Sequence, residues 1–389
     1  MIYADNAATT KLDIDAFEAM APYLLSEYGN ASQPYSFSRS AKKAIKEARQ
    51  IIANCINATP EEIYFTSGGT ESDNWAIKGS AFYDQEKRET ITSSIEHHAL
   101  LQSCAAIERL GYPVTYIGVS HEGIVSKDEL AKNISSKTRL VSVMLVNNEI
   151  GSVQPIQELC RIAHQYNAIF HTDAVQALGH IKVDVQELGV DMLSASAHKF
   201  NGPKGIGFLY IRNGTPIAPL SDGGAQEFGL RAGTENVAAI IGMAIALRKN
   251  CLQIDQHSAH LNKLEHTLLS RLNQAKLDYV RNGSIHHIPG NISLSFRNVS
   301  GESLLHRLDL MGICVSTGSA CDNVNTRVSH VLQAIGLDEE YANGTIRISL
   351  SHENTIEEII RIVECIIKIL KVVNATLILD HSDTEKVYH

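Results

Sequence analysis

Short apolar runs typical of β-strands alternate with helical segments through the first two thirds of this chain. The strand candidates lie at residues 62–66, 90–92, 114–118, 140–146, 168–171, 192–196 and 207–211. Helical segments such as 156–165 lie between them. Parallel strands need a helix-length crossover, so strands that alternate with helices in this way form βαβ units. The pattern therefore predicts an α/β domain built on a mainly parallel sheet.

The order of predicted helices and strands changes after about residue 250. A long helical stretch at 256–274 is followed by short strand candidates at 291–296 and 345–350, with helices among them. This pattern is typical of a smaller α+β domain. A chain of 389 residues has room for more than one domain of about 150 residues. We expect a large domain over 14–250 and a small domain formed by 1–13 and 251–389.

Charge and hydropathy argue against two classes of protein. The chain carries 34 basic and 43 acidic side chains, a net charge of −9, without a basic stripe, so we expect no nucleic-acid partner. The apolar stretch 359–373 includes four charged side chains between Arg361 and Lys371, so it is expected to cover a core rather than span a bilayer. The first residues show no leader pattern. We expect a cytoplasmic protein with no membrane partner.

The cysteines and histidines do not form a metal-binding pattern. The seven cysteines are scattered without a Cys-x-x-Cys pair, which is typical of free thiols in a reducing compartment. Three short His or Cys pairs each lack a second matching pair, and zinc needs three or four converging ligands, so we expect no metal. These pairs are His97–His98, His286–His287 and Cys160–His164.

The segment 67–71 joins a strand candidate to a helical stretch. Two glycines, Gly68 and Gly69, let the backbone approach a ligand closely, and the N-terminus of the following helix favours an anion. No Gly-Lys-Ser/Thr follows, so this is not a Walker loop. An ordinary turn with Thr70 as the N-cap residue is the alternative, and the segment alone favours that alternative.

Two further strand candidates end in residues that can carry chemistry. Asp173 follows an apolar strand, where a helix-capping role is the usual interpretation. Lys199 follows Ser196 and His198 at the end of another strand, although a single lysine is most often a solvated surface residue. Together with the 67–71 segment they match the needs of pyridoxal 5′-phosphate (PLP): a phosphate site, a Schiff-base lysine and a carboxylate for the pyridinium nitrogen.

At this level of agreement the sequence resembles a cysteine desulfurase of the NifS/IscS type, within the class-V aminotransferases. The matching motifs occur in the family's order, at 3–10, 65–72, 96–98, 147–151, 171–176, 196–199, 231–236, 316–321 and 346–349. The resemblance implies a fold-type I PLP-dependent transferase, whose large domain holds a mainly parallel seven-stranded sheet beside a smaller α+β C-terminal domain.

The resemblance also implies roles around the cofactor. Lys199 would carry PLP and move protons at the substrate Cα and Cβ. Asp173 would pair with the ring nitrogen, Gln176 would donate to the phenolic oxygen, and His97 would stack on the ring and act in proton transfer. The phosphate would be bound by one set of small and polar residues: Gly69, Thr70, Ser196 and His198, joined by Thr234 from the other subunit of a homodimer.

The substrate and the sulfur would be handled by three more residues. Asn148 would contact the cofactor and, with Arg347, hold the substrate carboxylate, for which a guanidinium fork is suited. Cys321 would be the nucleophile that takes the sulfur atom. A free cysteine is more commonly a buried apolar thiol, but the small and polar residues around Cys321 are typical of an exposed loop, which a reactive thiol needs.

The implied function is conversion of L-cysteine to L-alanine, with a persulfide left on Cys321. The persulfide would supply a sulfur-acceptor protein, such as an iron–sulfur scaffold, or a thiolation acceptor. The tail at 376–389 does not resemble the family segment that contacts the scaffold, so the acceptor stays open. Alternatives are a selenocysteine lyase or related PLP β-lyase, and a non-catalytic sulfur-relay partner that keeps the fold.

Overall fold

The computed structural model describes residues 1–84, 86–317 and 328–384, with side chains up to Val372. The chain forms two compact units. The large unit comprises Thr9–Asn148 and Ser152–Ile254, and the small unit comprises Met1–Ala8, Glu149–Gly151 and Asp255–His389. The sequence predicts a large domain over 14–250. These limits remain a prediction about functional domains, whereas the two units above describe compactness.

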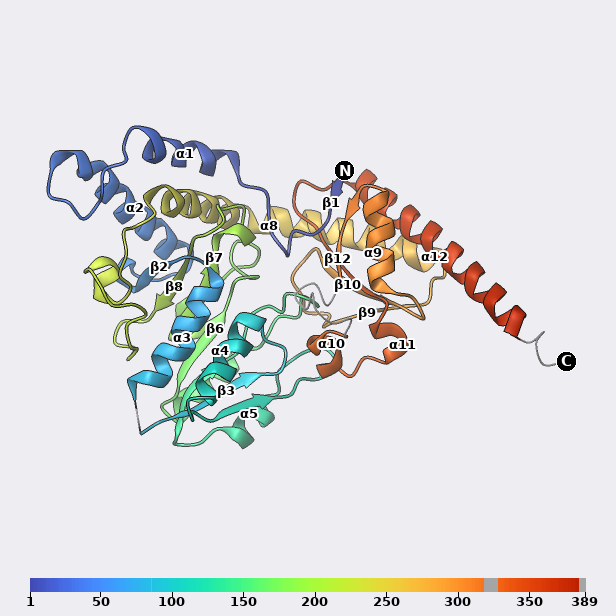
Figure 1. Cartoon of the computed structure of the whole chain (residues 1–389), viewed down its shortest axis with the longest axis horizontal. Helices are drawn as coiled ribbons and strands as arrows, with labels where there is room; N and C mark the ends of the chain where they lie inside the picture. The colour runs from blue at the N-terminus through green and yellow to red at the C-terminus, as the bar shows by residue number, and fades with distance from the viewer. Residues whose placement is uncertain (85, 318–327, 385–389) are drawn as a thin grey trace. The chain divides into compact units, whose positions relative to one another are not determined.

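A seven-stranded sheet forms the centre of the large unit (Figure 1). Its order is β2-β8-β7-β6-β5-β3-β4, and the five strands from β7 to β4 run parallel, while β8 is antiparallel to both of its neighbours. The strands are β2 (Ile63–Thr66), β3 (Glu89–Ser93), β4 (Val114–Ile117), β5 (Thr138–Ser142), β6 (Ile169–Asp173), β7 (Met192–Ser196) and β8 (Gly207–Ile211). The mainly parallel α/β sheet expected from the sequence is confirmed.

One strand ends earlier in the structure than the sequence pattern predicts. β5 ends at Ser142, whereas the apolar run continues to Val146. The run continues because Val143 and Leu145 are buried in the connection that follows, where their N–H groups donate to His171 and Asp173 carbonyls of β6. Periodicity does not distinguish a strand from a buried extended connection.

Helices cover the sheet of the large unit. These helices are α1 (Ile14–Leu25), α2 (Arg39–Cys55), α3 (Gly69–Tyr83), α4 (His98–Glu108), α5 (Lys127–Asn133), α6 (Ile156–Gln165) and α7 (Val185–Leu188). α3 and α4 lie side by side in Figure 1 and share one apolar cluster with β5, β7 and β8, centred on Trp75, Leu100 and Leu209. α2 is amphipathic, with buried alanines and isoleucines at helical spacing from Ala41 to Ala53.

The small unit holds a four-stranded antiparallel sheet of order β12-β13-β10-β9 and a parallel pair of β1 with β11. Its strands are β1 (Ile2–Tyr3), β9 (Tyr279–Arg281), β10 (Asn291–Phe296), β11 (Ile313–Cys314), β12 (Ser316–Thr317) and β13 (Thr345–Ser349). Its helices are α9 (Gly301–Leu310), α10 (His330–Ala334), α11 (Glu339–Ala342) and α12 (Ile356–Thr384), while α8 (Val237–Gln274) contributes to both units.

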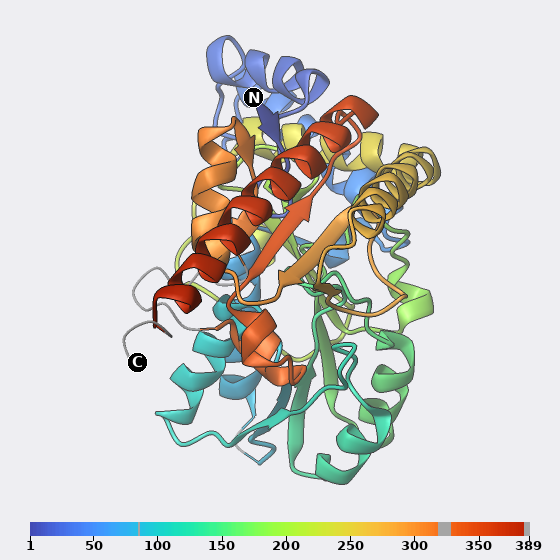
Figure 2. The same ribbon diagram turned by 90° about the vertical axis from the view of Figure 1, so that its right-hand side faces the viewer.

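The apolar stretch at 359–373 belongs to α12, which packs with α9 on the strands β10 and β13 (Figure 2). Ile359, Ile362 and Ile366 are buried, while Arg361 and Glu364 are exposed, so the expected amphipathic core helix is confirmed. Among the described residues, only α8 is long and apolar enough to cross a membrane. Half of its apolar window is buried inside the structure, as in a core helix.

Candidate active site

The loop between β2 and α3 leaves a helix N-terminus open. Gly68 is the N-cap residue of α3, and no described side chain caps the first turn. The φ of Gly68 is +146°, in the region that favours glycine. The alternative interpretation, a turn capped by Thr70, is wrong, because Thr70 is the second residue of the helix. The first N–H groups of this 15-residue helix can therefore serve an anion.

A cavity of about 340 Å³ is bounded by this helix end. Four residues expected to bind a phosphate line it together: Gly69, Thr70, Ser196 and His198. The other lining residues are Thr9, Ser67, Gly68, Glu71, Lys204 and Gly205. Backbone N–H groups, hydroxyls, an imidazole and one lysine form a donor set that suits a phosphate dianion.

The strands that carry this cavity approach each other very closely. A Cβ at Gly207, the first residue of β8, would lie 2.3 Å from the Ala195 carbonyl oxygen and 2.7 Å from the Gly68 Cα. Only glycine fits at this point, so Gly207 allows the β2–α3 loop to lie against β7. No local sequence pattern marks Gly207, because the contact depends on the approach of Gly68, which is far from it in the chain.

His198 carries a neutral ring at ordinary pH. Burial, together with the nearby cations of Lys199 and Lys204, lowers its pKa to about 4. Its Nδ1 lies 3.2 Å from the Thr9 hydroxyl. The imidazole is therefore a hydrogen-bonding group of the cavity rather than a fixed positive charge.

Asp173 ends β6 and is buried. Its Oδ1 accepts a 2.8 Å hydrogen bond from the Val175 N–H, which orients the carboxylate. Burial raises the pKa of Asp173 to about 6, while the Val175 hydrogen bond and the Lys199 charge oppose this. A buried carboxylate of this kind is stabilised in its charged form by a cationic ligand.

Lys199 lies near Asp173 because their strands are neighbours. β6 and β7 are parallel, with Asp173 paired to Ser194, and Lys199 ends the short helix Ala197–Lys199 that follows β7. Its carbonyl oxygen accepts from the His180 ring Nε2 over 2.8 Å, which fixes the backbone. The carboxyl ends of adjacent parallel strands thus bring the lysine and the carboxylate to one edge of the sheet, where ligands bind in open α/β folds.

A buried polar layer supports this edge and was missed by the sequence analysis. His171 is fully buried and lies between the hydroxyls of Ser142 (2.8 Å from Nδ1) and Ser194 (2.9 Å from Nε2). Burial lowers its pKa to about 3, so the ring is neutral. Asp73 of α3 lies 3.8 Å from His171 Nε2, and burial, followed by the Asp173 charge, raises its pKa.

Glu96 and His97 precede α4. Glu96 is fully buried, with its carboxylate accepting from the Ser93 hydroxyl (2.5 Å) and the Met144 N–H (3.0 Å). Burial raises its pKa to about 8. His97 is the N-cap residue of α4, and its Nδ1 accepts from the Ala99 N–H over 3.1 Å. This hydrogen bond fixes the ring orientation of a residue that the sequence analysis placed over the cofactor.

The remaining expected residues of the large unit lie at different places within it. Gln176 is buried three residues after Asp173. Asn148 is half-buried and follows Asn147, whose side chain donates to the Ile95 carbonyl over 2.9 Å. Thr234 does not line the 340 Å³ cavity; it lines a second cavity of about 190 Å³, together with Ser67 and Gly205.

Arg347 belongs to β13 of the small unit and is buried. Its Nη2 donates to the Asp5 carboxylate over 2.8 Å, and its backbone pairs with Ser316 of β12. Cys321 comes four residues after β12 ends and lies outside the described residues, as do the residues that follow it up to Arg327. Among the described residues, no group of three or more His, Cys, Asp or Glu side chains could hold a metal ion.

Comparison with known proteins agrees with this geometry. The family model described as aminotransferase class-V matches residues 2–362. The chain is 50% identical to cysteine desulfurase IscS of Dictyoglomus turgidum, over 92% of this chain and 91% of that protein. It is 46% identical to cysteine desulfurase IscS of Methanosarcina thermophila, over 95% of this chain and 92% of that protein.

Solved structures show the same likeness. A NifS-like protein superposes with a TM-score of 0.90 at 38% identity, covering 95% of this chain and 99% of that one. SspA in complex with cysteine superposes with a TM-score of 0.81 at 36% identity, covering 91% and 100%. The chain belongs to the class-V aminotransferase family, and within that family to the cysteine desulfurases. These families are PLP-dependent, and the fold is that of a fold-type I PLP enzyme.

Proposed function

We propose that this chain binds PLP, converts L-cysteine to L-alanine and receives the sulfur atom on Cys321 as a persulfide. The observation that carries the proposal is the edge of the large sheet, where a phosphate-type cradle, a lysine and a buried carboxylate lie at the ends of neighbouring strands. Relatives named cysteine desulfurase at up to 50% identity support the same reaction. The complex of SspA with cysteine supports the substrate.

The residues present fit the cofactor. The open N-terminus of α3, with Gly69, Thr70, Ser196 and the neutral His198, suits its phosphate. Asp173, whose charge is disfavoured by burial, suits a protonated ring nitrogen. Lys199 would attach the cofactor covalently, and Gln176 and His97 would contact its ring. When bound, PLP supplies an electron sink that stabilises negative charge at the substrate Cα.

Each side chain of the site would have its own role in the reaction. Arg347 and Asn148 would hold the substrate carboxylate, and Asn148 would also contact the cofactor. Lys199 would remove the proton at Cα and return protons to Cα and Cβ, with His97 assisting. The Cys321 thiolate would attack the substrate sulfur, so that an S–S bond forms while the Cβ–S bond breaks. The electron pair of the broken bond stays on Cβ, which takes a proton and becomes the methyl group of alanine.

A homodimer accounts for an exposed apolar face on α1. Ile14, Phe17, Leu24 and Leu25 of α1, and Tyr28 just after the helix, are between 52% and 79% exposed. Monomers seldom leave so many large apolar side chains of one helical segment in water, so a second copy of the chain is the proposed cover. In this dimer, Thr234 would reach the phosphate of the other subunit. The sulfur would pass to an acceptor protein in the cytoplasm, such as an iron–sulfur scaffold.

The test compares alanine and sulfide release from L-cysteine, with a reductant present, in the wild type and in Cys321→Ala. Cys314→Ala is the matched control, because Cys314 is a partly exposed thiol of the small unit. We expect equal amounts of alanine and sulfide from the wild type and the control, and loss of both in Cys321→Ala with the cofactor still bound. Turnover that survives Cys321→Ala would support a β-lyase or selenocysteine lyase. Bound cofactor without turnover in any variant would support a non-catalytic relay.

A further inference from the structure

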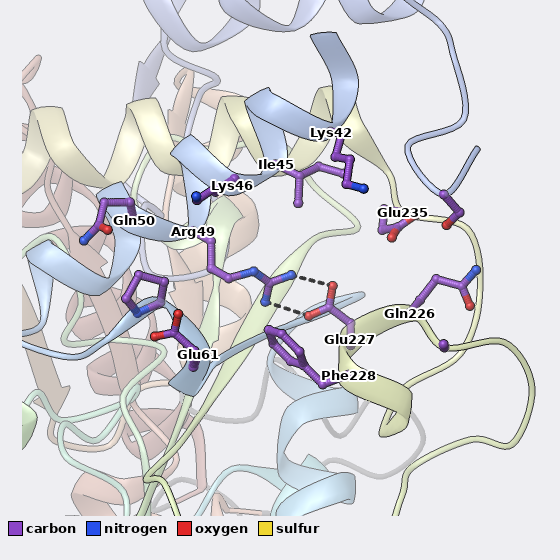
Figure 3. Close-up of a pocket in the computed structure, with 13 residues that line it drawn as sticks. Lys42, Ile45, Lys46, Arg49, Gln50, Glu61, Gln226, Glu227, Phe228 and Glu235 are labelled. Atoms are coloured by element: carbon purple, nitrogen blue, oxygen red, sulfur yellow. Dashed lines mark hydrogen bonds and ion pairs between the residues drawn. The ribbon is translucent and has the colours of Figure 1, made fainter. Parts of the chain in front are cut away.

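A largely buried ion pair fixes the segment that leads to Thr234. Arg49 of α2 and Glu227 form two parallel hydrogen bonds, from Nη1 to Oε2 over 2.9 Å and from Nη2 to Oε1 over 2.8 Å (Figure 3). Their side chains are only 11% and 3% exposed. Bidentate pairing between a guanidinium and a carboxylate sets orientation as well as distance, so the pair holds the Glu227 backbone in one place.

The same two side chains also bind the edge strand of the large sheet. Glu227 Oε2 accepts from the Phe65 N–H of β2 over 2.9 Å, and Arg49 donates to the Ile63 carbonyl of the same strand. The Arg49 guanidinium lies over the Phe65 ring, 4.3 Å from its centroid, and 5.2 Å from that of Phe228. Three segments that are distant in the sequence, α2, β2 and the 226–229 turn, therefore meet at one carboxylate.

The backbone at this point adopts a conformation that the side chains themselves disfavour. Glu227 and Phe228 have φ values of +44° and +56°, two consecutive left-handed residues that are not glycine. Such a pair persists only where its surroundings determine it. The contacts with Arg49 and β2 stabilise this backbone conformation, since they hold the Glu227 side chain from two sides.

Beyond this kink the chain returns to the phosphate cradle. Arg231 donates to Glu71 of the first turn of α3 over 2.9 Å, and Glu71 in turn accepts from the Ser67 hydroxyl over 2.5 Å. Thr234 follows three residues later and lines a cavity of about 190 Å³ that also includes Glu227 and Ser67. The position of Thr234 thus depends on a segment fixed at one end by the Arg49–Glu227 pair.

We propose that Arg49 and Glu227 are positioning residues of the cofactor site, which act by setting the 227–228 kink so that Thr234 is presented to the phosphate of PLP in the other subunit of the proposed dimer. The inference rests on the proposed function, because it assigns Thr234 to that phosphate. Neither Arg49 nor Glu227 lines the 340 Å³ cavity, so any effect on cofactor binding is indirect. It reaches the cavity either through the 227–234 segment or through β2 and the loop that follows β2. The pair therefore acts on cofactor affinity rather than on recognition of L-cysteine.

The test is a double-mutant cycle on the dissociation constant of PLP. Cofactor-free wild type, Arg49→Met, Thr234→Val and the double variant are titrated with PLP and followed by absorbance. We expect Arg49→Met and Thr234→Val each to raise the dissociation constant about tenfold. The double variant should bind PLP little more weakly than either single variant, because both changes remove the same contact of Thr234 with the phosphate. With PLP saturating, the KM for L-cysteine should change less than twofold.

A matched control separates positioning from loss of stability. Arg139 is another buried arginine of the large unit, whose guanidinium donates to the Ser80 and Pro216 carbonyls away from this segment. Arg139→Met should lower the melting temperature but leave the PLP dissociation constant within twofold of the wild type. If Arg49→Met does not fold, Glu227→Gln, which keeps the side-chain shape, replaces it in the cycle.

Two results would overturn the inference while leaving the proposed function intact. One is wild-type PLP affinity in both Arg49→Met and Glu227→Gln. The other is full additivity with Thr234→Val, which would mean that the pair and Thr234 act independently. A wild type that takes up no PLP would overturn the proposed function together with this inference.

Discussion

The guanidinium of Arg347 holds the carboxylate of Asp5 at 2.8 Å, with side chains that are 7% and 19% exposed. The pair ties the N-terminal segment to β13, where the Asn6 N–H also donates to the Ser349 carbonyl. A guanidinium has five N–H donors, so one bound carboxylate leaves donors for a second. Asp5 therefore orients the arginine that we propose for the substrate carboxylate.

Replacement of Arg347 should act mainly on substrate binding. Arg347→Lys keeps the charge but loses the planar fork, and we expect KM for L-cysteine to rise by about 100-fold. Asp5→Asn keeps Arg347 and weakens only its orientation, so an increase of roughly fivefold is expected. Steady-state kinetics with PLP saturating measures both. Arg281→Lys, at a partly buried arginine paired with Glu265 in the same unit, should leave KM unchanged. A normal KM in Arg347→Lys would contradict the assignment.

The sequence was sufficient to predict the sheet and the residues that lie just after its strands. Apolar runs bounded by glycine and polar residues located β2, β6, β7 and β8 closely, because those strands are buried on both faces. The 67–71 segment, Asp173 and Lys199 follow such runs directly. Their convergence then depends only on the parallel order of neighbouring strands.

The buried polar layer could not be predicted in the same way. Asp73, Glu96 and His171 have their partners on other strands, helices or connections, so no local pattern marks them as buried. His171 ends an expected strand, and Glu96 lies in the 96–98 motif, but neither position shows in sequence which partners it meets. The Arg49–Glu227 pair joins positions 178 residues apart, which no periodicity connects. The role of Cys321 rests on the family resemblance and on the proposed chemistry, since the residue lies outside the described part of the structure.

Asp173→Asn should separate cofactor attachment from catalysis. The amide is neutral and does not favour a protonated ring nitrogen, so we expect kcat to fall by about 10³-fold. Lys199 remains, so reduction with borohydride followed by peptide mass analysis should still find PLP on Lys199. Asp184→Asn, at the half-buried N-cap residue of α7 in the same unit, should keep full activity. Near-normal kcat in Asp173→Asn would refute the proposed role of this carboxylate.

Glu96 should make the stability of the cofactor-free protein depend on pH. Burial raises its pKa from 4.5 to about 8, so the folded state binds a proton that the unfolded state releases between these values. Stability contributed by this group is therefore lost as pH rises from about 5 to 8. Glu96→Gln removes that loss, so the stability of the variant relative to the wild type should improve by about 2–4 kcal/mol over this range.

Urea unfolding at pH 5 and pH 8 measures the Glu96 effect. Asp73 and Asp173 also have raised pKa values and are present in both proteins, so the difference between wild type and variant reports Glu96 together with its charge effect on these two carboxylates. Glu47→Gln, at an exposed position of α2, is the control and should show no such pH dependence. A Glu96→Gln difference that is the same at both pH values would show that Glu96 is ionised in the folded protein.

The exposed face of α1 should control both assembly and cofactor affinity. Leu24 and Leu25 are 59% and 79% exposed, so two aspartates there should not disturb the fold of one subunit, while their charges would be buried in a dimer. We expect Leu24→Asp/Leu25→Asp to sediment as a monomer and to bind PLP about tenfold more weakly, because Thr234 of the other subunit is then lost from the site. Leu310→Asp, at an 87% exposed leucine of α9, should stay dimeric with normal affinity. A double variant that remains dimeric would place the subunit interface elsewhere, and a monomer with unchanged PLP affinity would show that Thr234 serves its own subunit.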